Sequence, residues 1–129
     1  MSLLFADTYY WIALTNPRDS AHRQVMEFTA RLGPLSVITT DEVFTEFLAY
    51  CASDRQLRLQ GGLAVRELLN DPDIRTIPQT RTDCRSTRPV PTRATCISMQ
   101  IMRQERLTDV LTNDRHFEQE GFRALFRDS

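Results

Sequence analysis

TDVLTNDRHFEQEGFRAL, residues 108–125, holds two short apolar segments separated by a polar stretch with an acidic residue at its centre. Residues 109–111 predict a short strand, and Thr112-Asn113-Asp114 follows it as a polar turn. Residues 115–120 predict a turn or a short helix that ends at Gly121, and residues 122–126 predict a last strand. A strand, a short connection and another strand are typical of an α/β domain.

The same alternation of strands and helices extends toward the N-terminus. Further strands are predicted at residues 2–6, 35–39 and 73–77. Helices are predicted at residues 19–32, 40–52, 55–69 and 97–105. Asp19 or Ser20 is the expected N-cap of the first helix, and Thr40 or Asp41 that of the second. This alternation predicts a mostly parallel sheet with helices on both faces, and no linker divides residues 1–129 into several domains.

One segment does not fit this pattern. Residues 79–95, QTRTDCRSTRPVPTRAT, contain four arginines and two prolines and show no apolar period. They predict a loop, although a parallel crossover normally contains a helix at this place. The four arginines are Arg81, Arg85, Arg88 and Arg93. We interpret them as an accidental basic loop rather than an RNA-binding patch, because the whole segment has the composition of a disrupted one.

The overall composition is that of an ordinary globular domain. The chain has 129 residues, 41% of them hydrophobic, and a net charge of −1, which excludes an overall basic field for nucleic acid. All 16 basic residues are arginine, which a codon preference explains better than a phosphate site does. The three cysteines have no zinc spacing. The N-terminal apolar run is too short for a signal peptide and no segment predicts a membrane span, so we expect a cytoplasmic protein.

Three acidic residues are the candidates for chemistry. Asp7 ends the first predicted strand and Asp114 follows the strand at residues 109–111, so both belong to the edge of the sheet where ligands bind. Each of these acids taken alone is equally well explained as a helix cap or turn former. Glu46 lies about 60° outside the apolar arc of its predicted helix, at the edge of the packed face. The apolar arc is formed by Val43, Phe44, Phe47, Leu48 and Cys51. Glu42 lies farther out and predicts a solvated acid of the first turn.

Carboxylates that converge in one pocket repel each other unless a cation neutralises them. Oxygen ligands without a His or Cys partner favour Mg²⁺ or Mn²⁺, and such a metal supports hydrolysis of a phosphodiester. Thr8, Thr112 and Asn113 lie beside the acids in the sequence and can orient carboxylates or water. His116 is more simply explained as a structural residue. The sequence contains no phosphate-cradling glycine loop, HExxH or GxSxG motif.

Three stretches, FADTYYWIAL, VITTDEVFTEFLAY and TDVLTNDRHFEQEGFRAL, resemble the PIN-domain proteins, which include VapC-type toxins of bacterial toxin–antitoxin pairs. The resemblance covers about residues 2–78 and 96–126. It implies a three-layer α/β/α sandwich with a mostly parallel five-stranded sheet, and a ribonuclease that uses Mg²⁺ or Mn²⁺. It places family acids at Asp7, Glu46 and Asp114, as catalytic residues and metal ligands. It also implies RNA as substrate, a cognate antitoxin as partner, and homodimers in some members.

The chain departs from the family at one acidic position. Cys96-Ile97-Ser98 matches the start of a family helix, but the acid that precedes this motif in the family is replaced by Thr95. The helix expected upstream is also missing, and our hypothesis is a frameshift or deletion in the gene, which its nucleotide sequence tests. The resemblance therefore implies a ribonuclease with strongly reduced or absent activity.

Two alternatives to an active ribonuclease stay open. One is a noncatalytic PIN remnant that still binds RNA or an antitoxin. The other is a plain doubly wound domain that binds a small anionic ligand, for which metal affinity should not depend on Glu46.

Overall fold

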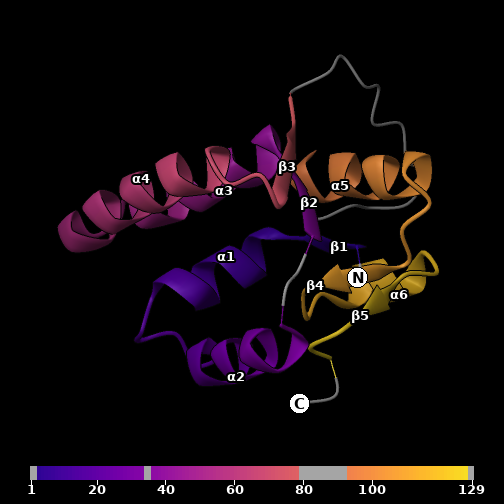
Figure 1. Ribbon diagram of the computed structural model, residues 1–129, viewed down its shortest axis with the longest axis horizontal. Helices are drawn as coiled ribbons and strands as arrows, with labels where there is room; N and C mark the ends of the chain where they lie inside the picture. Colours follow the sequence, from indigo (N-terminus) through magenta and orange to yellow (C-terminus); the bar gives the residue numbers. More distant parts are fainter. Residues whose placement is uncertain (1–2, 34–35, 79–92, 128–129) are drawn as a thin grey trace.

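The computed structural model describes residues 3–33, 36–78 and 93–127. Their strands form one sheet in the order β3-β2-β1-β4-β5, and each neighbouring pair is parallel (Figure 1). The strands are β1 Leu3–Ala6, β2 Ser36–Thr40, β3 Ile74–Ile77, β4 Asp109–Leu111 and β5 Arg123–Ala124. The predicted α/β class with a parallel five-stranded sheet is confirmed.

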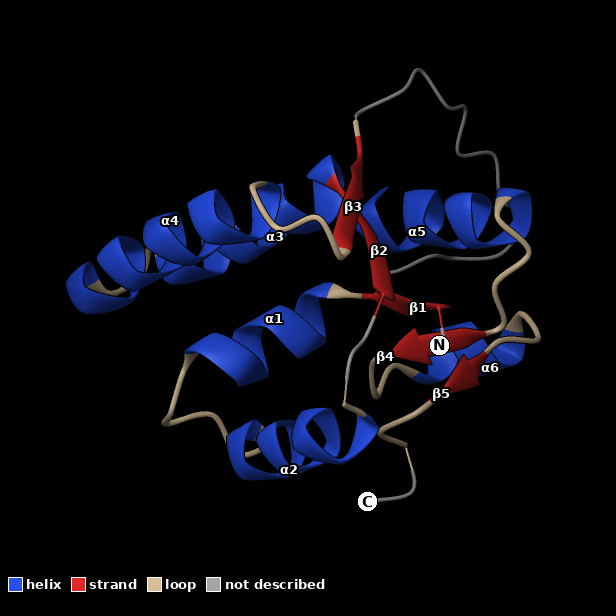
Figure 2. Ribbon diagram, viewed as in Figure 1, coloured by secondary structure: helices blue, strands red, loops and turns tan. Residues whose placement is uncertain are grey.

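Six helices accompany the sheet in the described part of the chain (Figure 2). They are α1 Thr8–Thr15, α2 His22–Leu32, α3 Asp41–Cys51, α4 Arg55–Leu69, α5 Arg93–Gln104 and α6 Arg115–Gln119. Helix α3 packs against α1, α4 and α5, and α1 packs in turn against α2. In Figure 1, α1 and α2 lie below the group formed by α3 and α4.

Several element boundaries differ from the prediction, and the differences at α5 and β5 are the ones that bear on the pocket. Helix α5 begins at Arg93, four residues before the predicted start at residue 97, so the end of the segment predicted as loop is helical. Strand β5 covers only Arg123–Ala124 instead of residues 122–126. Phe122 and Phe126 are nevertheless buried, because their rings pack into the core from either end of this short strand. Residues 79–92 of the atypical segment, with three of its four arginines, lie outside the described residues.

The predicted caps are right for α3 and wrong for α2. The hydroxyl of Thr40 accepts a hydrogen bond from the backbone N–H of Val43, as expected of an N-cap. At α2 the N-cap position is Ala21, which has no side-chain cap. Asp19 accepts from the backbone N–H of Ala21 instead, so its carboxylate closes an Asx-turn before the helix rather than capping it.

The core holds the start of α1 firmly against the sheet. Trp11 is 2% exposed, and its indole N–H donates to the hydroxyl of Thr39 on β2. That hydroxyl donates in turn to the carbonyl of Ala6 at the end of β1. These bonds join α1, β1 and β2 directly beside Asp7. The backbone that carries this acid is therefore fixed by buried hydrogen bonds from two other elements.

Helix α4 supports α3 through an unusually close contact at Gly61. A Cβ atom at this position would lie 2.7 Å from the sulfur of Cys51, so a side chain does not fit without a shift. This glycine lowers intrinsic helix stability, but it allows α4 to approach the helix that carries Glu46. No helix in the described residues is long and apolar enough to cross a membrane.

Candidate functional site

A pocket lies where β1 and β4 end, beside α1, α3 and α5. Because β1 and β4 are parallel neighbours, the residues that follow them emerge at the same edge of the sheet. The residues that line the pocket are Asp7, Thr8, Tyr9, Ile12, Glu46, Thr95, Thr112, Asn113, Asp114, Arg115, His116 and Arg127. The structure thus brings together all three predicted catalytic acids and all three predicted supporting residues.

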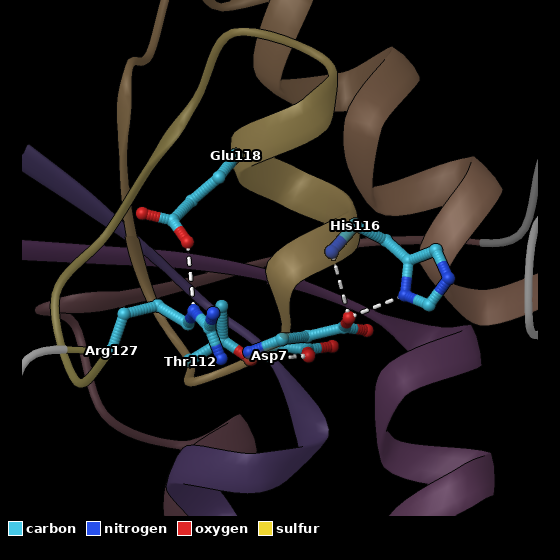
Figure 3. A network of polar contacts seen from close by, with 6 residues as sticks. Asp7, Thr112, His116, Glu118 and Arg127 are labelled. Carbon is cyan, nitrogen blue, oxygen red and sulfur yellow. Dashed lines mark hydrogen bonds and ion pairs between the residues drawn. The ribbon is translucent and has the colours of Figure 1, made fainter.

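Asp7 is the most buried of the three acids, with 6% of its surface exposed. One of its carboxylate oxygens, Oδ2, accepts a hydrogen bond of 3.0 Å from the hydroxyl of Thr112 (Figure 3). The pKa of Asp7 is raised to about 6, mainly by burial and also by the negative charges of Glu46 and Asp114, although hydrogen bonds from the backbone of Thr8 and the hydroxyl of Thr112 lower it. The charged form of Asp7 is therefore less favourable in this pocket than in water.

Thr112 connects two of the acids. Its hydroxyl donates to Asp7 and accepts a 3.2 Å hydrogen bond from the backbone N–H of Asp114. The side chain is completely buried, so water does not compete for these bonds. The spacing between the β1 acid and the β4 acid is therefore set by a single buried hydroxyl.

Asp114 is both a helix cap and a pocket residue. Its Oδ1 accepts a 2.9 Å bond from the backbone N–H of His116 and also lies 2.6 Å from the Nδ1 atom of that residue (Figure 3). Asp114 is thus the N-cap of α6, which is the structural role that the sequence also allowed. Both contacts use the same oxygen, and no described residue donates to Oδ2 of Asp114. His116 itself lines the pocket and positions this carboxylate.

Glu46 reaches the pocket from α3. It is half-buried at the edge of the packed face, as predicted, and its charge acts on Asp7. Glu42 does not line the pocket, but it is half-buried, so the prediction of a solvated acid is wrong. Leu48, which was predicted in the apolar stripe, is 38% exposed.

Thr95 lies in the same pocket as the three acids. It belongs to the first turn of α5 and is 4% exposed. The alignment of Cys96-Ile97-Ser98 had assigned this residue to the position of an acid. The pocket therefore holds a neutral hydroxyl where the resemblance implies a further carboxylate.

The donor atoms of the pocket suit a hard divalent cation in their chemistry. Three carboxylates supply the oxygen atoms, and repulsion among them needs a positive charge. The imidazole of His116 also lines the pocket, but its Nδ1 atom is already engaged with Asp114. The hydroxyl of Thr8, which also lines the pocket, is buried and has no hydrogen-bond partner, so it is an unsatisfied oxygen at this place. Within the described ranges, however, no three His, Cys, Asp or Glu side chains are close enough to form a ready-made metal site. The residues fit a metal by type, and their side chains must approach each other to bind it.

Sequence reasoning missed Arg127 as a pocket residue. Its Nε donates a 2.7 Å hydrogen bond to Glu118, and its side chain lines the pocket beside Thr112 (Figure 3). A signal was available, because Arg127 follows the last strand and emerges at the same edge of the sheet as Asp7 and Asp114.

Comparison with known proteins finds a likeness at the level of the fold. Neither a protein-family model nor a curated protein matches the sequence. The structure is similar to the crystal structure of VapC20 from Mycobacterium tuberculosis, described as a sarcin-ricin loop cleaving toxin. The TM-score is 0.79 over 94% of this chain and 96% of that chain, at 22% sequence identity. The chain therefore has the PIN-domain fold of a VapC-type protein, as the resemblance predicted.

Proposed function

We propose that this chain is a metal-dependent endoribonuclease of the PIN type, and the toxin component of a type II toxin–antitoxin pair. The observation that carries the proposal is the meeting of Asp7, Glu46 and Asp114 in one pocket, from three distant parts of the chain. The fold shared with a toxin that cleaves the sarcin-ricin loop supports the same substrate class. The proposed substrate is RNA, and the proposed partners are a cognate antitoxin and a second copy of the chain. The proposed location is the cytoplasm.

The protein's own residues have separate tasks in this activity. Asp7 presents a buried carboxylate whose orientation is set by Thr112, and Asp114 presents Oδ2 while its Oδ1 is held by His116. Glu46 adds a third negative group from α3. A bound Mg²⁺ or Mn²⁺ would neutralise these groups and stabilise the charge that develops on the phosphate. None of the three acids needs to act as a covalent nucleophile, because water attacks in this class of reaction.

The activity should be reduced because Thr95 cannot supply a carboxylate. With three negative groups instead of four, the pocket attracts a first divalent cation less strongly, and a second one less still. A buried threonine also keeps the place that an acid would occupy dry and neutral. Native activity is therefore expected to need high Mn²⁺ or Mg²⁺ concentrations.

A noncatalytic PIN remnant is the second candidate function. Thr95 in the pocket favours it, together with the lack of a ready-made cluster of three ligands among the described residues. In this case the chain would bind RNA or an antitoxin without cleaving RNA. The same pocket would then serve as a recognition surface.

Cleavage of labelled single-stranded RNA by purified native protein, titrated with Mn²⁺, tests the proposal. We expect cleavage that rises with Mn²⁺ and falls by more than about a hundredfold in Asp7→Asn. Glu67→Gln is the matched control, because it removes an exposed acid of α4 away from the pocket. Equal rates in native protein and Asp7→Asn would reject the nuclease. RNA binding without cleavage at any Mn²⁺ concentration would support the remnant.

A further inference from the structure

The pocket has basic residues at its mouth as well as acids inside. Arg115 and Arg127 line it together with the three carboxylates, and both arginines are exposed. Arg115 begins α6, whereas Arg127 follows β5, so they come from opposite ends of the same short stretch of chain. An anionic chain that approaches the acids must pass these two positive groups, which offset the repulsion it meets there.

Arg127 is held from outside the pocket. Its Nε donates to Glu118, which does not line the pocket (Figure 3). The guanidinium group has five N–H donors, and this contact uses only the one on Nε. The four N–H donors on the Nη atoms have no partner among the described residues. The ion pair with Glu118 therefore orients the side chain and leaves its fork free for a ligand.

Arg115 has no ion-pair partner in the described part of the chain. Neither arginine is paired there with Asp7, Glu46 or Asp114, although all five residues line the same pocket. The three acids of the pocket therefore do not neutralise the two arginines through ion pairs. Two guanidinium groups whose Nη donors have no partner among the described residues, next to an acidic pocket, match a ligand that carries regularly spaced phosphates.

We propose that Arg115 and Arg127 form a phosphate-binding rim that holds the RNA backbone next to the acidic pocket. This inference rests on the proposed function, because it takes RNA as the molecule that enters. Each arginine contacts a phosphate oxygen and reads no base, so the rim contributes affinity and position but no sequence preference. Glu118 serves as a positioning residue that acts through Arg127.

The test measures binding of a labelled single-stranded RNA to metal-free protein in the Asp7→Asn background, where no cleavage interferes. Arg115→Gln and Arg127→Gln should each weaken binding about fivefold and lower the salt dependence of log Kd by about 0.7. Arg123→Gln, which removes an exposed arginine of β5 outside the pocket, is the matched control and should have little effect. Equal effects of all three changes would overturn the rim and leave only diffuse attraction.

Glu118→Ala tests whether RNA binding depends on the orientation of Arg127 or only on its positive charge. Removal of a negative charge should tighten RNA binding if only net charge matters. If Glu118 orients the guanidinium group of Arg127, RNA binding should instead become weaker by about twofold to fivefold, because the contact between Nε and Glu118 is lost. Tighter binding would contradict the proposed positioning role.

The ligand class is tested with a polyglutamate peptide of matched charge. If it binds as tightly as RNA with the same dependence on Arg127, the rim recognises acidic protein and the phosphate proposal is wrong. Failure of the rim is distinguishable from failure of the nuclease, because these measurements use metal-free protein and do not depend on cleavage.

Discussion

The two sides of the pocket are built differently. On the strand side, Asp7 and Asp114 follow β1 and β4 and are joined by the buried hydroxyl of Thr112. On the helix side, Glu46 has no hydrogen-bond partner among the described residues, and Thr95 replaces the acid that the resemblance implies. The strand side is thus organised in advance, whereas the helix side is less constrained and carries a single acid. This difference teaches that strand ends joined by a buried hydroxyl fix their side chains more firmly than the face of a helix does.

The largest effect should come from the buried acid on the strand side. Burial raises the pKa of Asp7 from its ordinary value of 3.8 to about 6 in the folded chain, so the folded state binds the proton more tightly. The resulting stability is present in full below about pH 3.8 and is lost as the pH rises through 6. Native metal-free protein should therefore lose about 2 kcal/mol relative to Asp7→Asn between pH 4 and pH 8.

Urea unfolding of both proteins across this pH range measures the difference, and the comparison cancels the titration of all other groups. Saturating Mn²⁺ at pH 8 should restore much of the lost stability to native protein but not to Asp7→Asn, because the cation favours the charged carboxylate. Parallel pH profiles of the two proteins would show that Asp7 carries no such penalty.

Removal of the link between the strand-side acids should have the next largest effect. Thr112→Val keeps the shape of the side chain but deletes the hydroxyl that contacts both Asp7 and Asp114. We expect Mn²⁺ affinity to fall about tenfold to a hundredfold, since the acids lose their common anchor. Stability should also fall by about 1–3 kcal/mol, because the backbone N–H of Asp114 loses its acceptor.

Thr112→Ser is the control, because it retains the hydroxyl and should keep Mn²⁺ affinity near the native value. Binding is measured by calorimetry, so it does not depend on cleavage. A native-like affinity in Thr112→Val would show that the strand side is not organised by this hydroxyl.

An acid added to the helix side should make the two sides more alike. Thr95→Asp supplies the carboxylate that the resemblance implies, at a residue that lines the pocket. Mn²⁺ affinity should rise about tenfold, and RNA cleavage at low Mn²⁺ should rise with it. Thr95→Asn, which has nearly the same shape without the charge, should not reproduce the gain. Equal cleavage by native protein and Thr95→Asp at every Mn²⁺ concentration would show that Thr95 is unimportant.

The strand side was also the more predictable from the sequence. Asp7 and Asp114 follow short apolar segments, and parallel strands necessarily bring their ends to one edge. Helical periodicity placed Glu46 at the edge of α3, but the same arc wrongly included Leu48 in the packed face. Periodicity describes a single helix, and it contains no information on how far α4 covers α3.

The finer contacts had no local signal. The bond between Thr112 and Asp7 joins residues 105 positions apart, so no window of sequence contains both. The ring of His116 was interpreted as structural, and its contact with Asp114 depends on the turn that begins α6. Arg127 was missed because its place in the pocket and its contact with Glu118 depend on how the chain turns after β5, which no local pattern shows.

The smallest effect should come from Glu46, on the helix side. Its charge is a lesser cause of the raised pKa of Asp7 than burial is. Glu46→Gln should therefore stabilise metal-free protein at pH 8 by less than about 1 kcal/mol, while it weakens Mn²⁺ binding because a ligand is lost. Opposite signs for stability and metal affinity distinguish a metal ligand from an ordinary surface acid. Glu67→Gln, the exposed acid on α4, should change neither quantity. If Glu46→Gln also leaves Mn²⁺ affinity unchanged, the helix side contributes no ligand, and the pocket binds cations through its strand-side acids alone.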